Sequence, residues 1–275
     1  MTRYPDPQAV ASTIREVALS EALPRFKRLQ AHEISEKRPG DLLTVADEAT
    51  ERALEARLAD LMPGSLVVGE EAVSRDAGVL GALESEAPCW VVDPIDGTIN
   101  FAGGLPLFAT MVALVHHGET VGAWIYDPVH DVMALAERGA GTALDGQPVR
   151  LDPPADPKRL SGCLHLSGYD RVLAARAAHN FDAVGPLLVL HCAGLEYQAM
   201  LGGRLHYALY RHTNPWDHAP GQLLLAEAGG YSACLDGSAY EIGVIRPQWP
   251  LLAAAGEEAW HTVRRLLFEW PEGAR

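Results

Sequence analysis

Two aspartates three residues apart directly follow a buried apolar run in the segment "CWVVDPIDGTINF" (89–101), where Asp93 and Asp96 flank a Pro-Ile pair. Carboxylates this close repel each other and raise each other's pKa unless a cation lies between them. The segment is therefore either a turn, in which aspartate caps its own backbone, or a site that holds a metal ion. An EF-hand calcium loop is excluded, because its twelfth position falls on Gly104, where a glutamate is required.

Other carboxylates show the same local pattern, each after an apolar strand or at the start of a helix. Glu70 and Glu71 follow "LVVG", and Asp217 opens a predicted helix. Taken singly, a glutamate at a strand end is commonly solvated, and an aspartate at a helix start is commonly an N-cap. Taken together with Asp93 and Asp96, carboxylates from separate segments that meet at one point can seat two Mg²⁺ ions.

The residues around the aspartate pair add further chemistry. The carbonyl of Ile95, fixed between the two aspartates, offers another oxygen ligand. Gly97 has no side chain, which lets a phosphate approach the backbone amides at the start of a helical turn. The hydroxyl of Thr98 can hydrogen-bond a metal-bound water while a carboxylate from elsewhere, for which Asp47 is the candidate, accepts the proton.

Helices and strands must position these residues. Apolar residues recur at helical spacing over residues 7–36, and a second helix begins in "TVADEATERALEARLADLMPG" (44–64) with Asp47 in its first turn. The segment 36–41 between them is predicted to be a loop. A buried strand carries the aspartate pair, and two pairs of apolar runs over residues 108–151 predict an antiparallel meander.

A proline-rich stretch, "DPPADPKR" (152–159), marks the boundary between two predicted halves. Residues 1–151 form an N-terminal metal-binding α+β half, and residues 152–275 form a C-terminal α/β half that completes the active site. The second half contains a predicted turn and helix in "NPWDHAPGQLLLAEAGG" (214–230), with Asp217 as the expected cap of the helix and glycine as its stop. Because strand and helix runs are mixed rather than strictly alternating, we expect a layered α+β fold.

Composition excludes several classes of function. The chain has 275 residues and a net charge of −14, which disfavours sequence-independent binding to the phosphates of nucleic acid. Four widely spaced cysteines form no C-x-x-C pair, so neither a zinc site nor a disulfide framework is expected. No run has the roughly 18 apolar residues that a membrane span needs. We therefore expect a cytoplasmic protein that binds a small phosphorylated metabolite, and neither nucleic acid nor membrane.

Three stretches resemble the signature motifs of the inositol monophosphatase family: "GEE" (69–71), "DPIDGTINF" (93–101) and "WDHAPGQLLLAEAGG" (216–230). In addition, "DLLTVADEATE" (41–51) resembles the segment that precedes the first motif in this family. The family belongs to the Mg²⁺-dependent, lithium-sensitive phosphatases, together with fructose-1,6-bisphosphatase. The resemblance spans about residues 10–260, and the combination of motifs is highly specific.

The resemblance implies a set of metal ligands. Glu70, Asp93 and the Ile95 carbonyl would surround one Mg²⁺. Asp93 would bridge to a second ion that Asp96 and Asp217 also hold. Glu70 would reach a third, weaker ion, which gives two or three ions in all.

The resemblance also implies catalytic roles, a fold and an assembly. Asp47 and Thr98 would activate the attacking water beside Glu70, and Gly97 with Thr98 would cradle the phosphate through backbone amides. The implied fold is an α/β/α/β/α sandwich of the sugar-phosphatase type, and the implied assembly is a homodimer.

The sequence departs from the family pattern where the substrate is recognised. Many members place a glutamate about seven residues before the tryptophan of the last motif, whereas in this chain the position falls on or near Tyr210, with Arg211 beside it. A phenol cannot accept two hydrogen bonds from vicinal hydroxyls as a carboxylate does. An arginine favours a second phosphate or carboxylate on the substrate. Glu196, in "HCAGLEYQAM" (191–200), is a candidate to take over a hydroxyl contact.

These patterns predict a Mg²⁺-dependent phosphomonoesterase that hydrolyses a small polyol or sugar-like phosphate with a metal-activated water. The same chemistry on histidinol phosphate, a 3′-phosphonucleotide or a sugar bisphosphate is the first alternative. A regulatory or binding protein that retains the fold is an alternative of another class. The complete set of carboxylates favours the enzyme over this last alternative.

Overall fold

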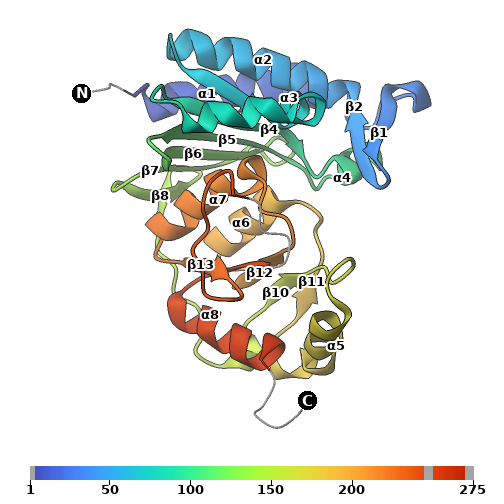
Figure 1. Ribbon diagram of the computed structural model, residues 1–275, viewed down its shortest axis with the longest axis vertical. Helices are drawn as coiled ribbons and strands as arrows, with labels where there is room; N and C mark the ends of the chain where they lie inside the picture. Colours follow the sequence, from blue (N-terminus) through green and yellow to red (C-terminus); the bar gives the residue numbers. More distant parts are fainter. Residues whose placement is uncertain (1–3, 245–249, 270–275) are drawn as a thin grey trace.

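The computed structural model describes residues 4–244 and 250–269, and its elements stack in five alternating layers (Figure 1). Helices α1 to α3 cover one face of a seven-stranded sheet, α6 and α7 lie between this sheet and a five-stranded sheet, and α8 and α5 cover the far side. The predicted layered α+β sandwich is thereby confirmed. The helices are α1 (Pro7–Val17), α2 (Val45–Leu61), α3 (Glu70–Arg75), α4 (Thr98–Ala102), α5 (Arg171–His179), α6 (Ala193–Leu201), α7 (Pro215–Glu227) and α8 (Glu257–Val263).

The seven-stranded sheet has the order β3-β4-β5-β6-β7-β8-β9. Strands β3 and β4 are parallel, and the remaining pairs are antiparallel, which confirms the meander predicted over residues 108–151. Every residue of β4 and β5 is buried, because helices cover both faces of the sheet. The strands are β3 (Leu66–Gly69), β4 (Cys89–Asp96), β5 (Ala109–His116), β6 (Glu119–Asp127), β7 (Val132–Glu137), β8 (Gly141–Leu144) and β9 (Gln147–Val149).

The five-stranded sheet has the order β11-β10-β12-β14-β13. Strand β10 is parallel to both of its neighbours, and β14 is antiparallel to both of its own. In the described ranges, no helix is both long enough and apolar enough to cross a membrane. The strands are β10 (Gly162–Leu164), β11 (Leu187–Leu188), β12 (Tyr207–Tyr210), β13 (Tyr231–Cys234) and β14 (Leu251–Ala254).

A hairpin replaces the end of the first predicted helix and the loop after it. Strand β1 (Ile34–Arg38) pairs antiparallel with β2 (Asp41–Thr44), and Gly40 makes the turn with a φ of +82°. The prediction of helix up to residue 36 and loop over residues 36–41 was therefore wrong. The helical spacing of apolar residues ends with α1 and one π-helical turn, Ala18–Ala22, and strand pairing with a later segment then takes over.

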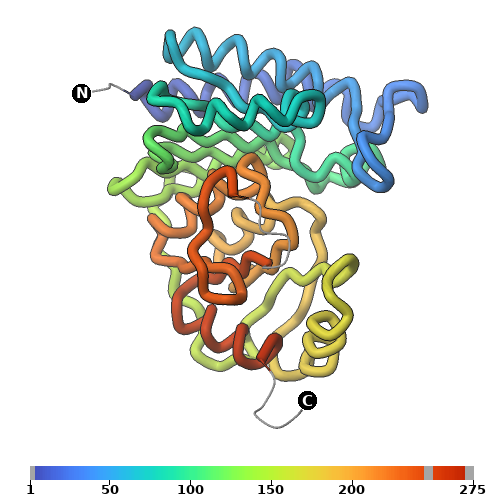
Figure 2. The backbone as a smooth tube through the Cα atoms, viewed as in Figure 1, coloured from blue at the N-terminus to red at the C-terminus, as the bar shows by residue number. Residues whose placement is uncertain are grey.

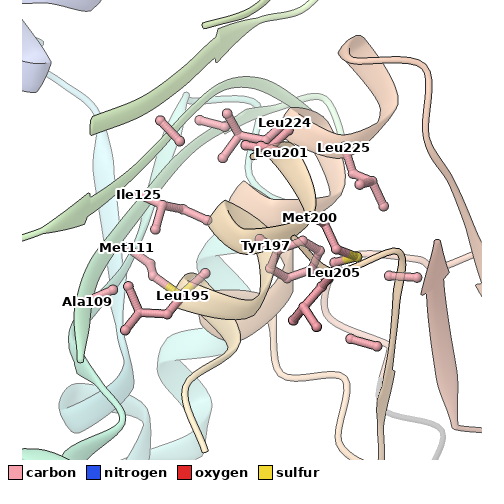
Figure 3. Close-up of a cluster of buried hydrophobic side chains, with 14 of the residues drawn as sticks. Ala109, Met111, Ile125, Leu195, Tyr197, Met200, Leu201, Leu205, Leu224 and Leu225 are labelled. Carbon is pink, nitrogen blue, oxygen red and sulfur yellow. The ribbon is translucent and has the colours of Figure 1, made fainter. Parts of the chain in front are cut away.

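The two predicted halves share one hydrophobic core. Met111 and Ile125, from β5 and β6, belong to the same buried cluster as Leu195 and Tyr197 of α6 and Leu224 of α7 (Figure 3). In Figure 2 the orange chain of α6 and α7 lies directly below the green strands of the larger sheet. The boundary predicted at residues 152–159 stays a prediction, because residues from both sides of it pack together in this core.

Candidate metal and phosphate site

A bulge in β4 brings Asp93 and Asp96 to the same side of the sheet. In a regular strand, side chains three residues apart point to opposite faces. Here Asp93 pairs with Met111 and Asp96 with Ala109, so β4 carries one more residue than β5 over this stretch. Such a bulge moves the later side chain to the face of the earlier one. The local backbone thus explains how both carboxylates reach one site.

Asp217 joins the two aspartates from α7. One oxygen each of Asp93, Asp96 and Asp217 lies within 4.8 Å of the other two. Asn214, not Asp217, occupies the N-cap of α7, so the prediction that Asp217 caps this helix was wrong. The helix begins earlier because Pro215 suits its first position. Asn214 Nδ2 donates to Asp217 Oδ2 at 3.0 Å and orients the carboxylate.

Burial raises the pKa of all three aspartates. The pKa of Asp96 rises to about 6, and those of Asp93 and Asp217 rise well above the ordinary value, with Glu70 adding to the repulsion. Within the described part of the chain, Asp93 Oδ1 is buried and has no hydrogen-bond partner. A buried carboxylate oxygen without a partner is costly. A cluster made only of carboxylate oxygens therefore fits a hard divalent cation such as Mg²⁺.

Glu70 lies at the start of α3, near this cluster, and pairs with a lysine. Lys37 Nζ, on β1, donates to Glu70 Oε1 at 2.6 Å and to Glu71 Oε1 at 3.1 Å. Burial alone would lower the pKa of Lys37, but the two carboxylates raise it above the ordinary value. Burial and the charge of Glu70 raise the pKa of Glu71 to about 8. Sequence reasoning missed the role of this lysine, because its segment was predicted to be a loop.

Asp47 and Thr98 lie next to each other, although they come from different layers. Thr44 caps α2, and its backbone amide donates to Asp47 Oδ2 at 2.8 Å in a capping box. The other oxygen of Asp47, Oδ1, lies 3.2 Å from Thr98 Oγ1. Burial raises the pKa of Asp47 to about 7, against the opposing effect of its hydrogen bond to Thr44. The structure thus places Asp47 and Thr98 side by side, the two residues that we predicted to act together on a water molecule.

Gly97 occupies a backbone position that excludes a side chain. Its φ is +86°, in the left-handed region, and it caps the short helix α4. An added Cβ would lie 2.8 Å from the Leu107 carbonyl oxygen and 3.1 Å from Cys192 Cβ. Thr98 Oγ1 also lies 2.9 Å from the Ile95 carbonyl oxygen. A side chain at position 97 would therefore collide with Leu107 and Cys192, so the conformation and the packing both favour glycine here.

Comparison with known proteins identifies the family. The family model described as "Inositol monophosphatase family" matches residues 7–267. The chain belongs to the inositol monophosphatase family. An inositol-1-monophosphatase of Rhizobium meliloti is 33% identical over 216 residues, which cover 77% of this chain and 79% of that protein. The Nus factor SuhB of Escherichia coli K12 is 31% identical over 213 residues, 74% of this chain and 76% of its own.

Solved structures of the inositol monophosphatase fold match nearly the whole chain. The extragenic suppressor protein suhB of Bartonella henselae superimposes with a TM-score of 0.74 and 26% identity, covering 97% of this chain and 95% of its own. An IMPase of Thermotoga maritima gives a TM-score of 0.75 at 23% identity and covers 94% of this chain and 98% of its own. This second likeness shows the fold alone.

The residues at which this chain departs from the inositol monophosphatase pattern lie in two environments. Glu196, on α6, is buried, and Cys163 Sγ donates to its Oε1 at 2.9 Å. Tyr210, at the end of β12, is also buried and stacks on Tyr197 with 5.4 Å between ring centroids. Arg211 is only half-buried. The predicted substrate contacts of all three residues stay predictions.

Two side chains that sequence reasoning missed connect the inositol monophosphatase motifs. Asn100 Nδ2 donates to the Leu190 carbonyl at 2.8 Å, which ties α4 to the segment before α6. Cys192 Sγ donates to Asp96 Oδ2 at 3.0 Å. Asn100 lies inside the motif "DGTINF", so its position was a usable signal. Cys192 gave none, because its contact depends on how α6 packs.

Proposed function

We propose that this member of the inositol monophosphatase family is a Mg²⁺-dependent phosphomonoesterase. The observation that carries the proposal is the cluster of aspartate oxygens within 4.8 Å of one another, together with Asp93 Oδ1, which is buried and has no hydrogen-bond partner among the described residues. When bound, Mg²⁺ neutralises phosphate charge and lowers the pKa of a coordinated water. The residues that would hold two or three such ions are Glu70, Asp93, Ile95 through its carbonyl, Asp96 and Asp217.

The chain's own residues would bind the phosphate and accept a proton. The Asp47 carboxylate has a pKa of about 7 and can therefore act as a base near neutral pH. Thr98, 3.2 Å from Asp47 Oδ1, would orient the attacking water by a hydrogen bond. Gly97 and Thr98, at the start of α4, would bind a phosphate oxygen through their backbone amides. In this arrangement the proton from the attacking water passes to Asp47.

The substrate proposed is a small polyol or sugar-like phosphate in the cytoplasm. Relatives that bear the name inositol-1-monophosphatase, at 32–33% identity, support this class. Histidinol phosphate, a 3′-phosphonucleotide and a sugar bisphosphate remain alternative substrates for the same chemistry. The homodimer is likewise a proposal, supported by the family resemblance.

The test is phosphate release from a panel of phosphomonoesters with and without Mg²⁺. The panel contains inositol 1-phosphate, histidinol phosphate, adenosine 3′,5′-bisphosphate, fructose 1,6-bisphosphate and glycerol 2-phosphate. We expect Mg²⁺-dependent release that is lost in Asp96→Asn and unchanged in Asp60→Asn, a matched change at an exposed position of α2. The absence of Mg²⁺-dependent release from every compound would contradict the proposal.

A second candidate function is regulation through a macromolecular partner. Several relatives at 30–31% identity bear the name Nus factor SuhB, and this observation favours the candidate. Under this reading, Asp96→Asn would lose any phosphate release but keep partner binding. Affinity purification of the wild type and the variant from the native host, compared by mass spectrometry, would separate the two functions.

A further inference from the structure

Four basic side chains gather beside the candidate phosphate site and form what we call the His-Arg cluster: His165, His191, Arg211 and His212. The rings of His165 and His191 meet edge to face with centroids 4.5 Å apart. Arg211 Nη1 donates to the Gly168 carbonyl at 2.8 Å, and its Nε donates to His212 Nε2 at 3.0 Å. Partial burial lowers the pKa of His165, and the nearby His191 and Arg211 lower it further.

The cluster is assembled from segments that are far apart in the sequence. It joins the residue after β10, the residue before Cys192 at the start of α6, and the two residues after β12. The whole chain carries a net charge of −14. The cluster therefore brings an arginine and three imidazoles together on a chain that is acidic overall.

His191 connects the cluster to the phosphate site. Its carbonyl oxygen lies 3.2 Å from the position that a Cβ on Gly97 would occupy. The next residue, Cys192, donates to Asp96 Oδ2. The backbone of one member of the His-Arg cluster therefore packs directly against Gly97, the residue proposed to bind phosphate.

The backbone of His191 is strained. Its φ is +53°, in the left-handed region that residues other than glycine rarely adopt. The imidazole is exposed, and its ring contacts that of His165, another exposed residue of the cluster. Strain of this kind is commonly retained where a side chain serves a binding site.

Arg211 has no acidic partner among the described residues. Its two hydrogen bonds go to a carbonyl and to an imidazole, both of which are neutral acceptors. The charge of Asp41 acts on His212 and raises the pKa of this imidazole against the other effects. Asp41 already has a basic partner, however, because Arg38 Nη2 lies 3.4 Å from its Oδ2. Glu196 is engaged by Cys163 instead. The guanidinium thus keeps its charge available for an anion.

We propose that the His-Arg cluster binds a second oxyanion on the substrate, either a carboxylate or a phosphate. This inference rests on the proposed phosphatase function and narrows its substrate class to phosphomonoesters that carry another anionic group. The planar fork of arginine matches both kinds of oxyanion through paired hydrogen bonds, and the imidazoles add further donors. A substrate with hydroxyls alone at this end would leave the guanidinium without an anionic partner.

Matched pairs of compounds test the inference. Glycerol 2-phosphate and 2-phosphoglycerate differ by one carboxylate, and fructose 1-phosphate and fructose 1,6-bisphosphate differ by one phosphate. For each pair we would measure kcat/KM for phosphate release with Mg²⁺, and Kd by calorimetry on Asp47→Asn with Mg²⁺. We expect the anionic member of at least one pair to be preferred by about tenfold or more, equivalent to about 1.4 kcal/mol. The pair that shows the preference identifies the anion.

Two variants tie the preference to the cluster. Arg211→Gln should remove most of the preference, whereas Arg265→Gln, which removes an exposed arginine near the end of the described chain, should keep it. His191→Gly relieves the left-handed strain, so it should leave the melting temperature unchanged or raise it while the anion preference falls. A lower melting temperature with the preference intact in His191→Gly would show a structural role and overturn the inference, even if Arg211→Gln failed to fold.

The outcomes separate this inference from the proposed function. Equal kcat/KM and equal Kd within both pairs would overturn the second anion site even if every compound were hydrolysed. If no compound released phosphate but calorimetry kept the anion preference and its dependence on Arg211, the second anion site would stand and the phosphatase proposal would fail.

Discussion

At the residue scale, the aspartate cluster is costly for the stability of the fold but useful for binding a ligand. Asp93 is buried near Glu70, Asp96 and Asp217, and all of these carboxylates raise its pKa after burial itself. Its Oδ1 has no hydrogen-bond partner in the described chain. Proteins retain such groups mainly at functional sites, where a ligand offsets their cost.

The first prediction concerns Asp93→Asn. In EDTA, the variant should melt at a higher temperature than the wild type, because one buried like charge is removed, and it should show no Mg²⁺-dependent phosphate release. Each kcal/mol gained should raise the melting temperature by about 2–4 °C. Asp131→Asn is the contrasting control, because Arg15 and Tyr126 lower the pKa of Asp131, so its loss should cost up to about 1 kcal/mol. A lower melting temperature for Asp93→Asn would contradict this account.

The second prediction concerns the cap of α2. Thr44→Ala removes the hydroxyl that accepts from the Ala46 and Asp47 amides and should cost about 1 kcal/mol of stability. It should also lower kcat, because the same hydroxyl donates to the Asp47 carboxylate. Thr44→Ser, assayed by thermal melting and steady-state kinetics, should restore both. If only stability changed, the capping box would have no part in orienting Asp47.

At the element scale, α6 and α7 approach each other unusually closely. Gly221 lies in α7, and an added Cβ there would be 2.2 Å from the ring of Tyr197 in α6. Tyr197 is fully buried, so its ring has no free space to move into. Because Asp217 lies one turn before Gly221 on the same face of α7, the spacing of these helices also sets the position of a candidate ligand.

The third prediction follows from this contact. An exposed glycine in a helix usually gains about 1 kcal/mol when changed to alanine, but Gly221→Ala should lose about 1–3 kcal/mol through overpacking and lower phosphate release. Gly81→Ala, where an added Cβ meets nothing within 4 Å, is the matched control. Chemical denaturation and the phosphate assay would measure both effects. A neutral Gly221→Ala would mean that Tyr197 can move aside.

Element by element, the sequence predicted what depends on local pattern. Apolar runs located β4 and the meander, and the motif around Asp93 located the carboxylates. The β1–β2 hairpin could not be found in this way, because its pairing is not visible in helical periodicity, and Lys37 was missed with it. The contact between Cys192 and Asp96 depends on the packing of α6, so no single segment could reveal it.

At the scale of the whole molecule, the two halves of the sandwich share one of their buried apolar clusters. The cluster in Figure 3 joins strands before residue 152 to helices after it. Burial of this apolar surface stabilises both halves at once. The fourth prediction is therefore that residues 1–151, expressed alone, will bind a hydrophobic dye and lack a cooperative thermal transition. Co-expression with residues 152–275 should restore the transition, and a fragment that melts cooperatively by itself would favour two independent domains.

The fifth prediction concerns pH. The folded-state pKa values of Asp47 and Asp96, about 7 and about 6, lie above the ordinary value of 3.8. A carboxyl that holds its proton more tightly when folded contributes stability at low pH, and this stability is lost as pH rises through the folded pKa. In EDTA, the melting temperature should fall between about pH 5 and about pH 8, and Mg²⁺ should oppose the fall. A rise over this range in EDTA would show that other groups neutralise the aspartates.

The contact of Lys37 with Glu70 and Glu71 makes ion uptake an exchange reaction. A tethered ammonium, 2.6 Å from Glu70 Oε1, already serves these carboxylates as counterion. An ion that binds Glu70 through Oε1 would compete with this ammonium, so its measured affinity would include the free energy of releasing the lysine. The same release would break the ion pairs that join β1 to α3. The rate at which a protease cuts the hairpin β1–β2 should therefore report how much of the Glu70 position is occupied by an ion.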